Sequence, residues 1–261
     1  MNTRPRVGDT PQTNKLIPSN ERLIFALDVA SRAEALAWVD RLGDSVQFYK
    51  IGMELLTSGE YFQVLADLAQ RGKRIFVDLK FFDVPATVAS AVRGLTRYPV
   101  DFCTVHGNNA MLKAAAEVKG EIKLLAVTAL TSLDEHDLAD LGFQCDARSL
   151  VLSRARAALA VGCDGVVSSG LEVPDLRREV DHRLIVVCPG IRPVANTDDT
   201  QVAVQAGSAT TSDDQKRTVD VRTAFENGAD YIVVGRPIRN SANPRATAEA
   251  MQQTIRTFFG Q

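Results

Sequence analysis

Short apolar segments alternate with amphipathic segments along most of the chain. From Leu23 onward, eight runs are rich in β-branched and other apolar residues, and stretches with helical periodicity separate them. The predicted strands cover residues 23–28, 46–52, 74–80, 101–107, 122–130, 165–169, 183–191 and 231–237. The predicted helices cover residues 31–42, 60–71, 86–97, 110–119, 147–161, 173–180, 219–227 and 244–258, with a shorter one near 133–141. This alternation indicates βαβ units and a parallel sheet.

The number of these units favours a closed barrel over an open sheet. Several of the strands are apolar throughout and then end abruptly in polar or Gly-containing groups, which is typical of strands buried on both faces. Eight units therefore predict a single-domain α/β protein, a (β/α)8 or TIM barrel. A doubly wound sheet is the alternative, but residues 28–31, Asp-Val-Ala-Ser, replace its GxGxxG fingerprint after the first strand. Phe62, on the helix at 60–71, is expected in the core.

Two segments stand apart from the repeats. Residues 1–20 are polar, carry three prolines and lack the apolar stretch of a secretory signal. We therefore expect a flexible tail at 1–20, followed by a barrel catalytic domain at 21–261. The segment at 193–217, between the last two strands, is rich in Asn, Thr, Asp, Gln and Ser. It is long for a loop between a strand and a helix, and loops of that length are usually functional or disordered.

The amino-acid composition limits the kinds of partner that the protein is expected to bind. With 30 basic and 32 acidic residues, the net charge of −2 gives no general attraction to nucleic acid or to a membrane surface. No apolar run approaches the roughly 18 residues that a membrane span needs. The four cysteines are scattered without a CxxC pair or metal-ligand spacing to the three histidines, so neither zinc nor disulfides are expected. We predict a cytoplasmic protein with a small-molecule partner.

Charged residues gather at the carboxyl ends of the first three predicted strands, where the active sites of such barrels lie. Asp28 ends the first strand and Lys50 lies in the second. Asp78 and Lys80 are two apart in the third strand, so both side chains should point to one face. An ion-pair network with a purely structural role would have the same composition. Three adjacent strands that bring charges to the same end favour a catalytic site.

The segments after the last two predicted strands contain residues that are typical of a phosphate site. The seventh runs into Pro-Gly-Ile and Arg192, and the eighth into Gly235, Arg236 and a proline. Barrels often bind phosphate in the loops after these strands, where Gly lets backbone N–H groups approach and Arg supplies a bidentate fork. We therefore expect a phosphorylated ligand.

The segment from Phe76 to Thr87, FVDLKFFDVPAT, closely resembles the DxKxxDxPxT signature of the orotidine 5′-monophosphate decarboxylase family. The similarity extends to ALD in the first strand, KIG in the second, and VTALTS, PGIRP and VVGRP further on, in the order of the family. It covers the chain from Leu23 to its end. The resemblance implies decarboxylation of orotidine 5′-monophosphate to UMP, a step of de novo pyrimidine biosynthesis, without a metal or any other cofactor.

The resemblance also implies roles for the charged residues. Asp28 and Lys50 would hold the ribose hydroxyls, and Lys50 would also join the charged array. Asp78 would lie against the substrate carboxylate. Loss of CO2 leaves an electron pair in the ring plane at C6, where no π-system accepts it. Lys80, in a dehydrated pocket, would supply the positive charge that stabilises this carbanion and would then protonate C6.

Further residues are assigned by the same resemblance to substrate binding. Thr131 would contact the pyrimidine ring. Gln215, preferred over Gln201, would bridge the phosphate and the base. The phosphate would be bound by Arg192, Gly235 and Arg236.

Two residues of the signature are implied to act between subunits. Asp83 and Thr87 would reach into the site of a neighbouring copy, so the active form would be a homodimer. Asp83 would thereby belong to the catalytic array of its partner.

Two other functions compete with this prediction. An Mg²⁺-dependent sugar-phosphate lyase or decarboxylase of the same barrel superfamily shares the DxKxxD motif, but such enzymes carry an acidic metal ligand on the second strand, where this chain has Lys50. A non-catalytic nucleotide-binding barrel would be expected to have lost part of the charged array, and no member of it is missing.

Overall fold

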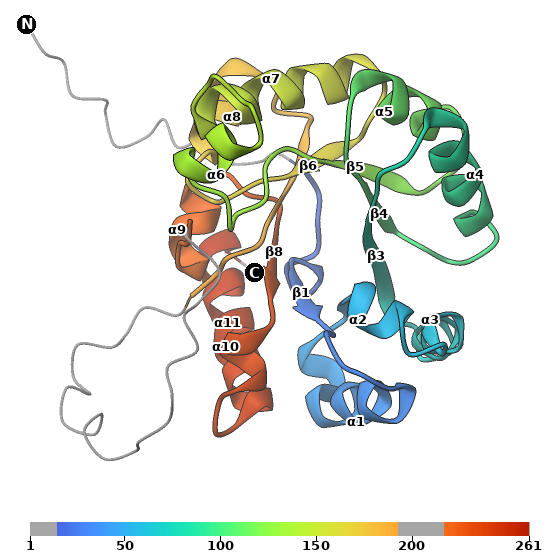
Figure 1. Ribbon diagram of the computed structural model, residues 1–261. Helices are drawn as coiled ribbons and strands as arrows, with labels where there is room; N and C mark the ends of the chain where they lie inside the picture. Colours follow the sequence, from blue (N-terminus) through green and yellow to red (C-terminus); the bar gives the residue numbers. More distant parts are fainter. Residues whose placement is uncertain (1–14, 193–216, 261) are drawn as a thin grey trace, which may run out of the picture.

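Eight parallel strands close into a barrel in the computed structural model, which describes residues 15–192 and 217–260 (Figure 1). The strands follow one another around the barrel in chain order, and β8 pairs with β1 to close it. They are β1 (Leu23–Ala26), β2 (Phe48–Ile51), β3 (Arg74–Phe81), β4 (Phe102–Val105), β5 (Lys123–Val127), β6 (Gly165–Val167), β7 (Ile185–Cys188) and β8 (Tyr231–Val234). The predicted (β/α)8 fold is confirmed.

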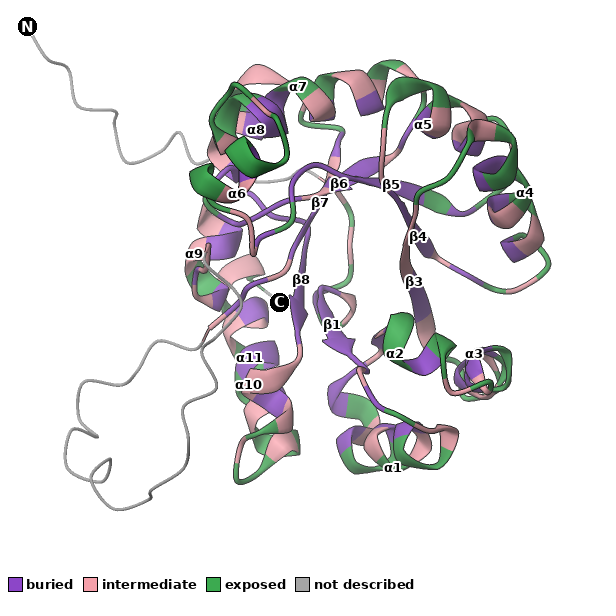
Figure 2. Cartoon of the chain, viewed as in Figure 1, coloured by how far each residue is buried: buried purple, intermediate pink, exposed green. Residues whose placement is uncertain are grey.

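Helices surround the barrel and turn their apolar faces toward it (Figure 2). They are α1 (Arg32–Leu42), α2 (Met53–Leu56), α3 (Tyr61–Gln70), α4 (Pro85–Leu95), α5 (Asn109–Ala116), α6 (Glu135–Asp140), α7 (Ala147–Ala160), α8 (Val173–Glu179), α9 (Val221–Glu226), α10 (Arg236–Arg239) and α11 (Pro244–Phe259). Capping residues fix several of the starts. The side chains of Ser31 and Asn108 each accept a hydrogen bond from the backbone N–H three residues on.

The structure differs from the predicted elements mainly at the carboxyl ends of the strands. The predicted strand at 231–237 ends at Val234, because Arg236 already begins the short helix α10. The sequence pattern also misses α2, which follows β2 after a single glycine. Both helices have four residues, about one turn, which is too short for helical periodicity to be recognised.

Aromatic side chains fill the interior of the barrel below its carboxyl end. The rings of Phe48, Phe102 and Tyr231 lie with centroids 5.0–6.0 Å apart. Phe76 packs edge-on against Phe102, and the guanidinium of Arg74 lies 4.5 Å from the ring centroid of Phe48 at the opposite end. The barrel interior is therefore a packed core, and a cavity for a ligand lies at the carboxyl ends of the strands.

Two expectations about individual residues are wrong. Phe62 is 47% exposed, because it lies on the outer side of α3 and stacks on the ring of Tyr98 instead of entering the core. The expected flexible tail at 1–20 extends too far, since Lys15, Ile17 and Ser19 pack against the barrel. Lys15 forms an ion pair with the buried Asp230, and Ser19 is buried.

Within the described ranges, no helix has the length and apolar composition needed to cross a bilayer.

Candidate active site

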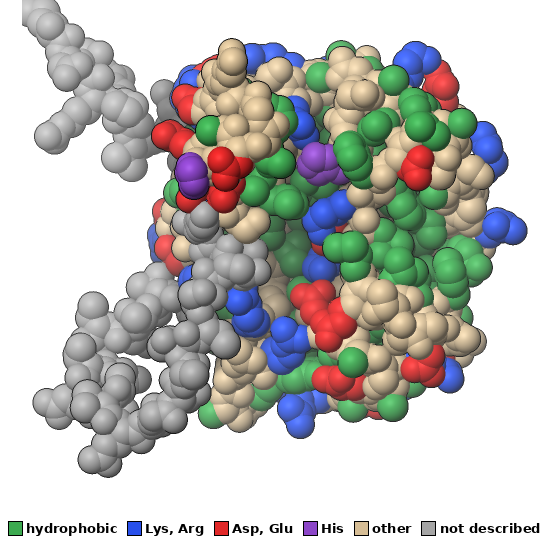
Figure 3. All heavy atoms as spheres, viewed as in Figure 1, with side chains coloured by type: hydrophobic (Ala, Val, Ile, Leu, Met, Phe, Trp, Pro, Cys, Tyr) green, Lys and Arg blue, Asp and Glu red, His purple; other side chains and the backbone are tan. Residues whose placement is uncertain are grey.

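A cavity of about 280 Å³ opens at the carboxyl end of the barrel. In the space-filling view, acidic and basic side chains gather in this hollow at the centre of the visible face (Figure 3). Its walls are formed by residues that lie at or just beyond the ends of the strands: Ala26, Asp28, Lys50, Phe76, Asp78, Lys80, Val127, Ala129, Leu130, Thr131, Ser132, Val167, Pro189, Gly190, Arg192, Val233, Gly235, Arg236 and Arg239. The cavity therefore brings together the first three strands and the last two, as the sequence predicted.

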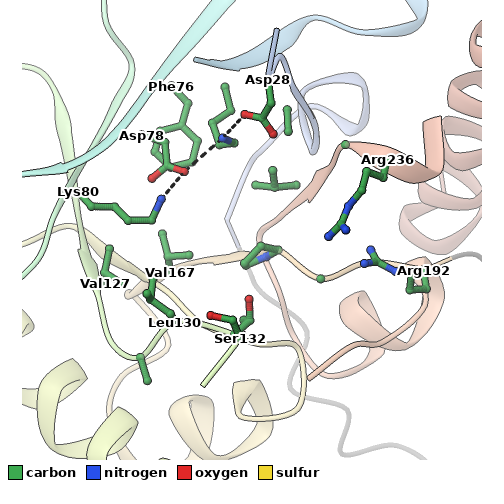
Figure 4. Close-up of a pocket in the computed structure, with 18 of the residues that line it drawn as sticks. Asp28, Phe76, Asp78, Lys80, Val127, Leu130, Ser132, Val167, Arg192 and Arg236 are labelled. Atoms are coloured by element: carbon green, nitrogen blue, oxygen red, sulfur yellow. Dashed lines mark hydrogen bonds and ion pairs between the residues drawn. The ribbon is translucent and has the colours of Figure 1, made fainter. Parts of the chain in front are cut away.

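One wall of the cavity carries four charges of alternating sign (Figure 4). Nζ of Lys50 lies 3.1 Å from Oδ1 of Asp28 and 3.4 Å from Oδ2 of Asp78. Nζ of Lys80 lies 3.0 Å from the same Oδ2. The predicted grouping of Asp28, Lys50, Asp78 and Lys80 is thus present as one continuous network, which we call the charged array.

Opposite charges keep the two central members of the array ionised. Burial alone would raise the pKa of Asp78, but the ammonium groups of Lys50 and Lys80 outweigh it, so this pKa lies below its ordinary value. Burial would lower the pKa of Lys50, but the carboxylates of Asp78 and Asp28 outweigh it and raise this pKa. Lys50 and Asp78 are therefore both charged at neutral pH, because the two shifts move their titration away from it.

Close packing around the array depends on two glycines. A Cβ atom on Gly52 would lie 3.3 Å from Nζ of Lys50, and one on Gly235 would lie 3.2 Å from Cβ of Ala26. Both contacts are tighter than side chains normally make. Gly52 therefore leaves room for the ammonium of Lys50, and Gly235 lets the end of β8 approach β1 closely.

Two arginines face the array across the cavity. Arg192 follows β7, and Arg236 begins α10 after β8. Figure 4 shows both guanidinium groups on the side opposite Asp78 and Lys80. A site with cations at one end and a charged array at the other suits an elongated anionic ligand, whose anionic group the guanidinium forks can bind.

The remaining predicted site residues fall into three groups. Thr131, which the resemblance assigns to the pyrimidine ring, is buried and lines the cavity. Asp83 and Thr87 are exposed near the start of α4, outside the cavity that the described residues form. Gln215 and the alternative Gln201 lie outside the described residues.

Sequence reasoning missed Arg239 and Thr104. Arg239 lines the cavity and donates a hydrogen bond to the backbone carbonyl of Asp28. Its place one helical turn after Arg236 could have identified it, had α10 been predicted. Thr104 is fully buried in β4, and its hydroxyl lies 2.9 Å from Oδ1 of Asp78. A lone threonine within an apolar strand gives no signal in the sequence.

Arg217 is a third residue that the sequence did not single out. Its Nη1 lies 2.5 Å from Oε1 of Glu172, at the start of α8, and its Nη2 donates to the carbonyl of Leu130 at 2.9 Å. Burial raises the pKa of Glu172, although Arg217 and Ser168 act against that shift. Because Leu130 precedes Thr131, Arg217 supports the wall of the cavity after β5.

The fold and the site together define a (β/α)8 barrel with a charged array and a facing pair of arginines, a class suited to phosphorylated substrates. Similarity to known proteins identifies a family within this class. Residues 21–251 match the Orotidine 5′-phosphate decarboxylase / HUMPS family, and the chain belongs to that family.

Relatives that match nearly the whole chain support this membership. The chain is 59% identical to an orotidine 5′-phosphate decarboxylase of Methylococcus capsulatus, with 95% of this chain and 97% of the relative covered. It is 54% identical to the protein of that name from Xanthomonas euvesicatoria, with 94% and 96% covered. Among solved structures, an orotidine 5′-phosphate decarboxylase from Lactobacillus acidophilus superposes with a TM-score of 0.75 at 33% identity, with 90% and 99% covered.

Proposed function

We propose that this protein decarboxylates orotidine 5′-monophosphate to UMP in de novo pyrimidine biosynthesis. The observation that carries the proposal is the charged array placed across one cavity from Arg192 and Arg236. The names of the relatives at 59% and 54% identity point to the same reaction.

Contacts with the phosphate supply binding energy at a distance from the reacting carbon. Arg192 and Arg236 bind the phosphate with the backbone of Gly235, and Gln215 bridges the phosphate and the base. Thr131 contacts the pyrimidine ring, and Asp28 and Lys50 hold the ribose hydroxyls. Energy from these remote contacts offsets the cost of placing the substrate carboxylate beside the array.

Lys80 performs the chemistry in this proposal. When the bond between C6 and the carboxylate breaks, CO2 leaves and its electron pair remains on C6. The ammonium of Lys80, already paired with Asp78 at 3.0 Å, stabilises that negative charge and then donates a proton to C6. The ionised Asp78 lies near the substrate carboxylate, and their repulsion eases as CO2 departs.

No metal or other cofactor takes part in this mechanism. The ammonium of Lys50 lies between the carboxylates of Asp28 and Asp78, where it supplies the positive charge that a divalent ion would bring. It would also repel such an ion. This arrangement argues against the Mg²⁺-dependent lyase, the other kind of enzyme that the sequence left open.

The proposal is tested by following the absorbance of orotidine 5′-monophosphate with purified protein in the presence of excess EDTA. We expect loss of substrate and formation of UMP at the same rate with and without the chelator. Absence of UMP under both conditions would refute the decarboxylase. UMP formation that stops with EDTA and resumes with Mg²⁺ would contradict the metal-free mechanism.

We further propose that the active form is a homodimer in which Asp83 and Thr87 complete the site of the partner. Both residues are exposed, as a contact with a second copy requires. Exposed apolar side chains accompany them on α2, on α3 and on the segment between β3 and α4: Met53, Leu56, Phe62, Phe82 and Val84. A surface of this kind is typical of a protein interface.

The cytoplasm is the location that we propose for this enzyme. All four cysteines are free thiols, and three of them are buried. A reducing compartment suits such a chain.

A further inference from the structure

The hydroxyl of Thr104 connects the two residues of β3 to which the proposed function assigns the chemistry. Thr104 lies in β4 and has no exposed surface. Its Oγ1 lies 2.9 Å from Oδ1 of Asp78 and 3.0 Å from the backbone nitrogen of Lys80. One side chain thus contacts the carboxylate of one residue and the backbone of the other, from behind the cavity wall.

The directions of both hydrogen bonds follow from the groups involved. The backbone N–H of Lys80 can only donate, so Oγ1 of Thr104 accepts there and its own proton remains for Asp78. An ionised carboxylate only accepts, which matches this arrangement. With Oδ1 of Asp78 held by the hydroxyl, Oδ2 faces the ammonium groups of Lys80 and Lys50 at 3.0 and 3.4 Å. Thr104 therefore fixes the rotation of the carboxylate within the array.

The bond to the backbone acts on the conformation of Lys80 itself. Lys80 has a φ of +48°, and among the described residues it is the one non-glycine with a positive φ. The pairing of β3 with β4 explains this: Val77 pairs with Cys103 and Phe81 with Val105, so residues 78–80 lie opposite the single residue Thr104. A left-handed backbone at a lysine is strained and persists only where neighbouring contacts hold it. The Thr104 hydroxyl is such a contact.

We propose that Thr104 is a positioning residue for the decarboxylation: its hydroxyl holds the carboxylate of Asp78 and the backbone of Lys80 in the geometry in which Nζ of Lys80 reaches C6. This inference rests on the proposed function. Without the hydroxyl, the carboxylate of Asp78 is free to rotate and the backbone at Lys80 is free to relax. Small displacements of a catalytic group are enough to slow a reaction strongly.

Three variants and one matched control test the proposal. Thr104→Val keeps the shape and removes the hydroxyl, and Thr104→Ser keeps the hydroxyl and removes the methyl group. Thr104→Cys offers only a weak donor. The control is Thr128→Val, because Thr128 is equally buried just after β5 and its hydroxyl donates to the carbonyl of Val167 at 2.9 Å, away from the array. For each protein, kcat, KM, the affinity for UMP and the midpoint of thermal unfolding are measured.

We expect Thr104→Val to lower kcat about 30-fold, while KM and the UMP affinity stay within about threefold of wild type. Thr104→Ser and Thr128→Val should keep kcat within about threefold, and Thr104→Cys should fall between the Ser and Val variants. Thr128→Val is also expected to lose thermal stability, since it removes a buried hydrogen bond to the carbonyl of Val167.

Several outcomes would overturn the role of Thr104. These are a wild-type kcat in Thr104→Val, an equal loss of kcat in Thr104→Val and Thr128→Val, and a loss in Thr104→Ser as large as in Thr104→Val. If Thr104→Val does not fold, a wild-type kcat in Thr104→Cys overturns the role instead. Wild-type protein that forms no UMP would refute the proposed function, and the assignment of Thr104 would fall with it.

Discussion

Nζ of Lys80 lies 3.0 Å from Oδ2 of Asp78, on the wall of a cavity whose opposite side carries two arginines. The same Oδ2 atom of Asp78 lies 3.4 Å from Nζ of Lys50. That Nζ atom lies 3.1 Å from Oδ1 of Asp28. The positive charge of Lys80 is thus placed by a chain of opposite charges that reaches back to β1.

Asp78→Asn should lower the free energy of unfolding at neutral pH by about 1–3 kcal/mol. The change leaves the ammonium groups of Lys50 and Lys80 without the carboxylate between them. The loss is smaller than for a fully buried pair, because the side chain of Lys80 is 31% exposed. Urea denaturation of both proteins measures the difference. The exposed Asp40, which pairs with Arg71 on the surface, provides the control variant Asp40→Asn.

The pH dependence of that difference has a definite sign. Because the folded-state pKa of Asp78 is lowered, the stability that its charge contributes is present above its ordinary pKa of 3.8 and is lost as the pH falls through the folded value. The gap between wild type and Asp78→Asn should therefore stay constant near neutral pH and shrink below about pH 4. A gap that persists unchanged at lower pH would contradict the lowered pKa.

Arg236→Ala should chiefly weaken the binding of phosphorylated ligands. Loss of one guanidinium contact to phosphate is expected to raise the dissociation constant of UMP about 10- to 100-fold, and to change the affinity for uridine little. Calorimetric titration with both ligands measures the ratio. Arg245→Ala is the control, because Arg245 pairs with Glu249 on the surface of α11. Equal losses for UMP and uridine would argue against a phosphate site at Arg236.

Arg217→Met should lower the free energy of unfolding, and the loss should be larger at neutral pH than at acidic pH. It removes the partner of Glu172 in a pair whose side chains are only 13% and 9% exposed, and a loss of about 3 kcal/mol is expected. Arg222→Met removes an exposed pair with Glu226 and should cost less than about 0.5 kcal/mol.

The raised pKa of Glu172 gives this prediction its pH dependence. Burial raises this pKa above its ordinary value of 4.5, and loss of Arg217 should raise it further. A raised folded pKa means that stability is fully present below the ordinary value and is lost as the pH rises through the folded value. The gap between wild type and Arg217→Met should therefore be smaller at about pH 4.5 than at about pH 7. Equal gaps at both values would show that Glu172 does not set the difference.

Mixing two inactive variants tests the proposed dimer. Lys80→Ala and Asp83→Ala should each be nearly inactive as homodimers. After subunit exchange at equal ratio, half of the dimers are mixed and each has one intact site, so the activity should rise to about a quarter of wild type. Activity no higher than the sum of the two separate variants would contradict a site shared between subunits.

The positions of site residues could be predicted from the sequence where a side chain lies at the end of a strand. Asp28, Lys50, Asp78 and Lys80 each lie in or just after one of three consecutive strands, so the eight-strand pattern was enough to bring them together. The same holds for Arg192 and Gly235 after the last two strands. In a parallel barrel, residues at the carboxyl ends of strands share one mouth.

Features that depend on register or on distant contacts could not be predicted in this way. The bond between Thr104 and Lys80 exists because three residues of β3 lie opposite one residue of β4, and no periodic pattern encodes that irregularity. Arg217 meets Glu172 across 45 positions of sequence. The exposure of Phe62 also escaped the pattern, because apolar periodicity does not distinguish a face against the core from one left for a partner.

The central claim, that the ammonium of Lys80 stabilises and protonates C6, is tested most directly by the single-turnover rate of Lys80→Ala with orotidine 5′-monophosphate. The affinity for UMP is measured in parallel, and Lys113→Ala, a change in a surface pair with Glu117, is the control. We predict a rate more than about 1,000-fold below wild type with UMP still bound, and a wild-type rate in the control. A Lys80→Ala rate above about a tenth of wild type would contradict the claim.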